Sequence, residues 1–87
     1  MQDRPYKEIK QSDYIIREFS QSIPTLELVW HRDKEDRIVQ ATHETDWQVQ
    51  LDNEIPQRLS KNKLFIPKKT YHRLIKGTGD LVVKIWQ

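Results

Sequence analysis

Residues 64–77 read LFIPKKTYHRLIKG, and this stretch carries the strongest indication of the fold. It predicts a short apolar strand, a tight turn that begins at Pro67, and a second strand over Tyr71–Ile75 that carries one histidine. Successive side chains of a strand point to opposite faces, so His72 and Tyr71 would face opposite sides of the sheet. In a small β-barrel, a histidine in this place can point into the interior, where a metal ion or a small ligand could bind.

Short segments with a period of two continue on both sides of this stretch. Alternation begins over Leu26–Trp30, and further strands are expected over Arg37–His43, Trp47–Leu51 and Leu81–Trp86. Turns are expected at residues 32–36, 52–53, 61–62 and 77–80, and Pro56 marks residues 54–59 as an edge or irregular strand. About seven short strands separated by turns are typical of an all-β sandwich or barrel. A parallel α/β fold is excluded, because no crossover helices are available.

Residues 1–24 are expected to form an N-terminal segment that packs on, or pairs with, a barrel formed by residues 25–87. Within this segment, residues 1–11 are polar and would be frayed or form an edge strand. Ser12 and Asp13 could cap a short helix over Tyr14–Ser20, and a strand over Tyr14–Phe19 is the competing prediction.

The composition limits the class of protein. A chain of 87 residues is one small domain, and with 32% charged residues its core must be small, so a homodimer that buries further apolar surface is expected. No cysteine is present, which excludes disulfides and thiolate ligands and fits a reducing compartment. No run of about 18 apolar residues and no signal-peptide core are found, so no membrane association is expected and a cytoplasmic location is the default.

The charges are distributed unevenly along the chain. Residues 1–57 hold 7 Lys and Arg against 12 Asp and Glu, whereas residues 58–87 hold 8 Lys and Arg against 1 Asp. The basic C-terminal third could bind a polyanion. Alternatively, the two parts neutralise each other within one fold or across a dimer. The second interpretation is favoured and nucleic acid is an unlikely partner, because no RNA-stacking signature surrounds Phe65, Tyr71 or Trp86.

Two motifs can be traced through residues 25–77. The pattern G-x5-H-x-H-x3,4-E-x6-G would run from Thr25 to Glu44, and G-x5-P-x-G-x2-H-x3-N from Lys61 to Lys76. In this register the chain resembles a single-domain cupin, a small double-stranded β-helix (jelly-roll) barrel. The spacing agrees, but every motif glycine, the second histidine, the glutamate and the terminal asparagine are replaced. The motif residues that remain are His31, Pro67 and His72.

The resemblance implies a ligand set. Cupins commonly hold a divalent metal with such histidines, so His31, Asp33 and His72 would form a two-histidine, one-carboxylate site for Fe, Mn, Ni or Zn. Arg37 stands where the family has its glutamate, and a guanidinium cannot ligate a metal. His43 could replace that glutamate, or it could lie exposed at the end of its strand.

Three interpretations of this cluster stay open. A metal site is the first. The second is a metal-free pocket in which Arg37 and the histidines bind an anionic small ligand, and the third is a purely structural ion pair of Asp33 with Arg37. The tryptophans Trp30, Trp47 and Trp86 could line a pocket or pack in the core, and Trp30 should face away from His31. The expected function is binding of a metal or a small anionic ligand. A catalytic form would be a metal-dependent dioxygenase or isomerase. The alternative is a non-catalytic interaction or regulatory module encoded by a phage or a bacterium.

Overall fold

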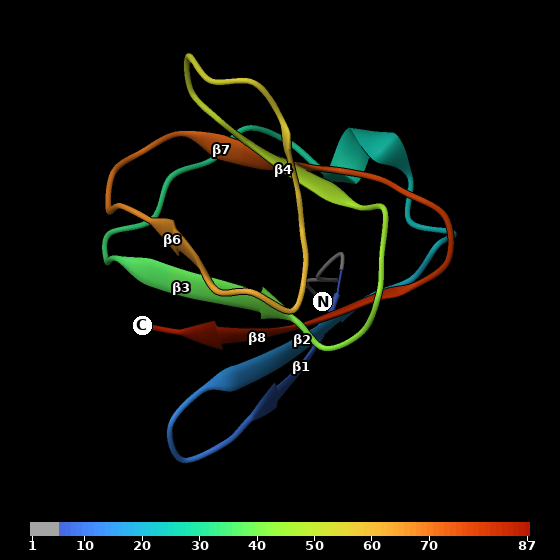
Figure 1. Ribbon diagram of the computed structural model, residues 1–87, viewed down its shortest axis with the longest axis horizontal. Helices are drawn as coiled ribbons and strands as arrows, with labels where there is room; N and C mark the ends of the chain where they lie inside the picture. The colour runs from blue at the N-terminus through green and yellow to red at the C-terminus, as the bar shows by residue number, and fades with distance from the viewer. Residues whose placement is uncertain (1–5) are drawn as a thin grey trace, which may run out of the picture.

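The computed structural model describes residues 6–87, which fold almost entirely into antiparallel strands. A five-stranded sheet has the order β1-β2-β8-β3-β6 and a three-stranded sheet the order β5-β4-β7, and together they form the walls of a barrel (Figure 1). This confirms the all-β jelly-roll prediction. None of the described residues belongs to a helix that could span a membrane. The strands are β1 (Lys7–Lys10), β2 (Ile15–Phe19), β3 (Arg37–Ala41), β4 (Gln48–Leu51), β5 (Gln57–Arg58), β6 (Leu64–Ile66), β7 (His72–Ile75) and β8 (Leu81–Trp86).

The core lies between the two sheets and follows the period of two in the sequence. Alternate residues of β3, β4 and β8 are buried, as their patterns predict. Val39 lies opposite Ile85 and Ala41 opposite Val83, so the inward side chains of β3 and β8 stand side by side. Trp47, immediately before β4, is fully buried and packs against Phe19 of β2. The core therefore joins the N-terminal strands to both sheets.

The N-terminal segment forms a strand where a helix was the first alternative. Ile15–Phe19 is β2, which pairs along its whole length with β8, so the helix predicted over Tyr14–Ser20 is wrong. The reason is tertiary: pairing with β8 places Ile15 and Phe19 on the core face, opposite Ile85 and Leu81. Among the described strands, β1 pairs only with β2 and lies at one end of the strand order. Residues 1–5 lie outside the described part of the chain.

The segment after Pro24 is the clearest departure from the predicted strands. Residues 26–30 do not form a strand; instead Thr25–Glu27 is a single 3₁₀ turn, η1. Its backbone is satisfied locally, since the N–H of Glu27 donates to the carbonyl of Pro24 and that of Leu28 to the carbonyl of Thr25. Leu26 is 86% exposed, so its alternation with Leu28 marks no core face. The chain rejoins the three-stranded sheet only at His31.

The turn between β6 and β7 is hydrogen-bonded to the loop of residues 31–36, so the parts of the chain that carry the two cupin-like motifs are in contact. Lys69 adopts a positive φ of 62°, and its N–H donates to the carbonyl of Asp33 at 2.7 Å. The N–H of the preceding Lys68 donates to the carboxylate of Asp36 at 2.8 Å. The Pro67 turn is therefore tied to the loop that carries His31 and Asp33, although about 35 residues separate them in sequence.

Gly77 lies so close to the backbone of Asp46 and Trp47 that no side chain fits at this position. A Cβ at this position would lie 2.7 Å from the backbone nitrogen of Trp47 and would overlap the Asp46 side chain. We expect Gly77→Ala to lower the free energy of unfolding by about 1–3 kcal/mol, the usual cost of forcing extra volume into a packed site. Urea unfolding of the variant and the parent protein measures this change. An unchanged midpoint would show that the loop can move away from Asp46 at no cost.

Candidate metal centre

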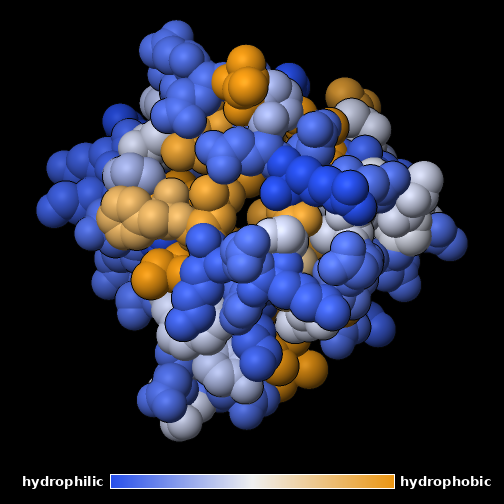
Figure 2. All heavy atoms as spheres, viewed as in Figure 1, coloured by the Kyte–Doolittle hydropathy of each residue, from blue (hydrophilic) through white to orange (hydrophobic). Residues whose placement is uncertain are grey.

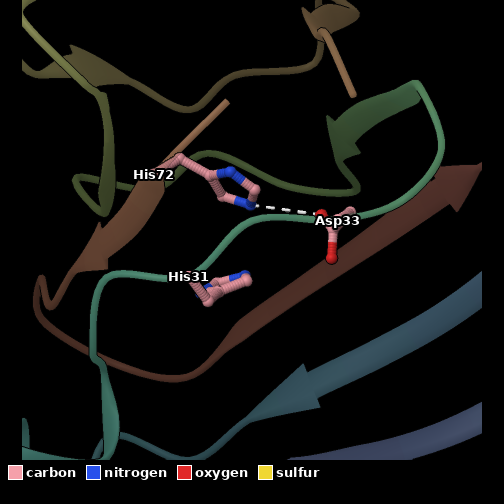
Figure 3. Close-up of side chains that lie close together, drawn as sticks. All are labelled: His31, Asp33 and His72. Atoms are coloured by element: carbon pink, nitrogen blue, oxygen red, sulfur yellow. Dashed lines mark ion pairs between the residues drawn. The ribbon is translucent and has the colours of Figure 1, made fainter. Parts of the chain in front are cut away.

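Two histidines from distant parts of the chain meet at an isolated backbone bridge. The N–H of His31 donates to the carbonyl of His72 at 3.0 Å, and the N–H of His72 donates to the carbonyl of His31 at 2.8 Å. Their rings consequently lie 4.3 Å apart, centroid to centroid. Asp33 follows two residues after His31, and one ligand atom from each of the three residues lies within 4.8 Å of the others (Figure 3). The structure thus brings together the three residues that the resemblance implies as ligands.

Backbone carbonyls fix the orientation of both imidazole rings. The Nδ1 atom of His31 lies 3.1 Å from the carbonyl oxygen of Val29, and that of His72 lies 2.8 Å from the carbonyl oxygen of Thr70. A carbonyl oxygen can only accept, so each Nδ1 carries a proton, and in the neutral form of the ring Nε2 presents a lone pair. This is the arrangement found around metal-bound histidines, whose second ring nitrogen donates to a carbonyl or carboxylate.

Asp33 lacks the hydrogen bonds that a buried carboxylate needs. Its Oδ2 atom lies 3.3 Å from Nε2 of His72 and 3.3 Å from Nε of Arg37. Neither contact has hydrogen-bond geometry, and Oδ2 is buried without a hydrogen-bond partner among residues 6–87. With the proton of His72 on Nδ1, the Nε2 lone pair of the neutral ring faces a carboxylate oxygen, and these two groups repel each other unless a metal ion or a second proton on the ring lies between them. The donor set therefore fits a metal ion.

Arg37 lies beside this set without completing it. Its Nε atom is also buried with no hydrogen bond in the described structure, so its ion pair with Asp33 is incomplete. A guanidinium has only donors and stays protonated, so it cannot supply a fourth ligand. It can donate to a carboxylate or another anion bound next to the three ligand residues.

The environment keeps His72 neutral. Burial lowers the pKa of His72 below its usual value of 6.5, and the nearby His31 and Arg37 act in the same direction. The hydrogen bond to Thr70 and the charge of Asp33 act against this shift but do not cancel it. Only a neutral imidazole can bind a metal, so the lowered pKa suits a ligand.

The same shift predicts how stability depends on pH. Because the pKa of His72 is lower in the folded state, the unfolded chain binds the proton more readily. The contribution of His72 is complete above its usual pKa of 6.5 and is lost as the pH falls through the lowered value. We expect chelator-treated protein to lose stability more steeply on acidification than a His72→Gln variant. Urea unfolding at a series of pH values tests this, and equal slopes for the two proteins would contradict it.

His43 lies apart from the cluster. Its Nδ1 atom contacts the carbonyl oxygen of Glu44 at 2.9 Å, and its Nε2 atom accepts the N–H of Val82 at 3.2 Å. The structure thus does not bring His43 to the other three residues. The tryptophans do not line the central cavity within residues 6–87: Trp47 is in the core, and Trp30 is 41% exposed and lies against Arg73.

The cluster forms one part of the wall of a cavity of about 430 Å³ inside the barrel. Figure 2 shows hydrophobic residues gathered around a hollow at the centre of the molecule, with hydrophilic residues surrounding them. Tyr6, Arg17 and Glu27 also line the cavity, and the sequence had not singled them out. Arg17 points inward because it lies opposite Val83 of β8, a position that follows only once β2 is a strand. If residues 14–20 were a helix, as predicted first, this pairing would be absent and the sequence would give no reason to place Arg17 in the cavity.

The uneven charge is not cancelled by local ion pairs. The strands of the basic third lie among the others, since β8 lies between β2 and β3, and β7 pairs with β4. Yet in residues 6–87 no Lys or Arg after residue 57 has an Asp or Glu oxygen within 4 Å. Arg58, Arg73 and Lys76 instead donate to backbone or amide oxygens. Neutralisation of these charges across a dimer stays a prediction.

The chain is similar to known proteins in its fold and not in its sequence. No family model matches the sequence, and neither does any curated protein. Among solved structures, the chain is similar to one described as DMSP lyases RdDddP and RnDddQII, with a TM-score of 0.69 and 12% identity over 83% of this chain. It is also similar to FeII HppE in complex with substrate, with a TM-score of 0.64 and 8% identity over 98% of this chain.

A third similar structure is a cupin-2 domain protein from Shewanella frigidimarina NCIMB 400, with a TM-score of 0.60 and 18% identity. This alignment covers all of the present chain and 82% of the other. The present chain spans only 35% of the DMSP lyase structure and 53% of HppE. At these identities the similarity concerns the fold alone. The chain therefore has the cupin fold that the spacing of its two motifs predicts.

Proposed function

We propose that this cupin binds one divalent transition-metal ion through His31, Asp33 and His72, and a small anionic ligand beside it through Arg37. One observation carries the proposal. The Nε2 atoms of two imidazole rings, which carry lone pairs in the neutral rings, converge on a buried carboxylate oxygen that accepts no hydrogen bond from residues 6–87. A cation between them satisfies all three groups at once.

The ligand set indicates which ions suit the site. Two histidines and one carboxylate with open positions are the set used by non-haem Fe(II) proteins, and Mn, Ni and Zn accept the same donors. His72 is 6% exposed, while His31 is an exposed residue, so the set extends from the interior toward solvent. When bound, such an ion supplies Lewis-acid or redox chemistry to a ligand in the cavity.

Charge favours an anion as that ligand. A divalent ion, the carboxylate of Asp33 and the guanidinium of Arg37 together leave the site positive. Arg37 offers a planar fork of donors, the geometry that recognises carboxylates and phosphates. In this arrangement Arg37 orients the anion, and the apolar walls of the cavity exclude water from around it. If the protein is an enzyme, we propose a metal-dependent dioxygenase or isomerase, in keeping with the solved structure of the FeII protein HppE.

The test is metal binding by tag-free protein, because a polyhistidine tag would itself bind metal. Protein is incubated with Fe(II) under anaerobic conditions, or with Mn(II), Ni(II) or Zn(II), then desalted and analysed for metal content and thermal midpoint. We expect about one ion per chain and a midpoint that rises with the free metal concentration and falls again with chelator. Asp33→Asn, which keeps the size of the side chain but removes its charge, should lose this response. No bound metal and no shift of the midpoint with any ion would refute the metal site and leave the metal-free anion pocket.

A further inference from the structure

The geometry points to a ligand with two anionic ends: a linear aliphatic dicarboxylate whose first carboxylate lies at Arg37 and whose second lies at Arg17. This inference rests on the proposed function, because it takes the anion at Arg37 as given. It adds a second binding point in the same cavity and thereby a class of ligand.

Arg17 is held in place as a recognition group would be. It lies directly opposite Glu8 on β1, and its Nε atom donates to a Glu8 carboxylate oxygen at 2.7 Å. Its guanidinium carbon lies 4.4 Å from the centre of the Tyr6 ring, and its side chain is only 14% exposed. Two fixed contacts restrict the rotamers of this long side chain before any ligand arrives.

The outer edge of this guanidinium remains available. Only Nε takes part in the bond to Glu8, and among residues 6–87 the two Nη groups have no hydrogen-bond acceptor. Arg17 nevertheless lines the cavity, whose walls are mostly apolar. A pair of parallel Nη–H donors in such a cavity matches a carboxylate. A ligand with an ammonium group at this end would be repelled by the positive charge of Arg17.

The strand register sets the separation of the two arginines. Arg17 lies opposite Val83, Val83 lies opposite Ala41, and Arg37 is four residues before Ala41 on β3. The two Cα atoms are therefore about 10 Å apart across the sheet and about 13 Å apart along it. A ligand that contacts both arginines must be elongated.

The wall between the two arginines is aliphatic. Val39, Val83 and Ile85 from the five-stranded sheet face Val49 and Leu74 from the three-stranded sheet across the cavity. The volume of about 430 Å³ falls in the range of small-molecule sites. A methylene chain would cover this wall and bring its two carboxylates to the polar ends.

The experiment measures binding as a function of chain length. Linear dicarboxylates from succinate to azelate, and monocarboxylates with the same numbers of carbons, are titrated by calorimetry into metal-loaded and metal-free protein. We expect one chain length at which the dicarboxylate binds at least about tenfold more tightly than its matched monocarboxylate, because only that length reaches both arginines. Equal affinity of the two series at every length, or no binding of either, overturns the inference.

Variants of Arg17 test whether this residue binds the second carboxylate of the ligand. Arg17→Met should bring the preferred dicarboxylate down to the affinity of the monocarboxylate. Arg17→Lys, which keeps a cation beside Glu8 but loses the fork, should also remove most of the preference and guards against a folding defect. Arg32→Met is the matched control, because Arg32 lies over Tyr71 and does not line the cavity. Preference that survives in both Arg17 variants would overturn the inference. Loss of metal binding alone would refute the proposed metal site and leave the chain-length test valid on metal-free protein.

Discussion

Replacing His72 with alanine is expected to lower the affinity for the divalent ion by more than about 100-fold. Removing a group that only supports a ligand already costs about 10–100-fold, and this change removes a ligand itself. The fold should persist, because the bridge between His31 and His72 uses backbone atoms only. Calorimetric titration with Ni(II) or Zn(II) measures the affinity, and the thermal midpoint without metal reports on the fold.

His43→Ala is the control for this prediction. It removes a histidine of the same chain whose ring bonds to Glu44 and Val82, away from the cluster. We expect this variant to bind metal as the parent protein does. If His43→Ala lost the ion and His72→Ala kept it, the assignment of His72 as a ligand would be wrong.

Replacing Trp47 with alanine is expected to cost about 3–5 kcal/mol of unfolding free energy, the usual loss for a buried tryptophan. Its side chain is fully buried, contacts Phe19 across the barrel, and donates from Nε1 to the carbonyl of Gly79 at 3.0 Å. Domains of this size have a total stability of about 5–10 kcal/mol, so the variant would be close to unfolding. Urea unfolding followed by circular dichroism measures the change.

Trp30→Ala is the matched control, because the same residue type is removed from a surface position. Trp30 is 41% exposed, and within residues 6–87 its ring stacks only with the Arg73 guanidinium, 4.9 Å from the ring centre. A contact of this kind is worth about 0.5–1 kcal/mol. Comparable losses for Trp30→Ala and Trp47→Ala would contradict the burial of Trp47 between the two sheets.

The barrel could be predicted from local patterns where burial follows the strand period. In β4 and β8, and in β3 from Val39 on, alternate residues are apolar, and these are the residues that the structure buries. The pattern misled at residues 26–30, where Leu26 and Leu28 alternate but Pro24 starts a 3₁₀ turn. Alternation of apolar and polar residues over five positions does not show whether a neighbouring strand is available for residues 26–30 to pair with.

The candidate site was predictable only in part, for a related reason. The spacing of His31 and Asp33 and the Pro67 turn before His72 place three ligand types in cupin register. The tautomers depend on the carbonyls of Val29 and Thr70, which no sequence pattern marks. Arg17 was missed because its inward direction depends on the pairing of β2 with β8. Long-range pairing is the information that a local reading lacks.

The carbonyl contacts of His31 and His72 also bear on when the metal enters. Each ring is held by the backbone of its own segment, at Val29 and at Thr70, so its direction does not depend on an ion. The proposed ligands would therefore be assembled by folding itself, in contrast to zinc fingers, whose folding requires metal. Loading of the proposed site would then be an exchange between a finished protein and the surrounding pool of ions. For such donors the intrinsic order of affinity favours Cu(II) and Zn over Mn and Fe(II), so the ion in the proposed site would be decided by which ion the compartment supplies.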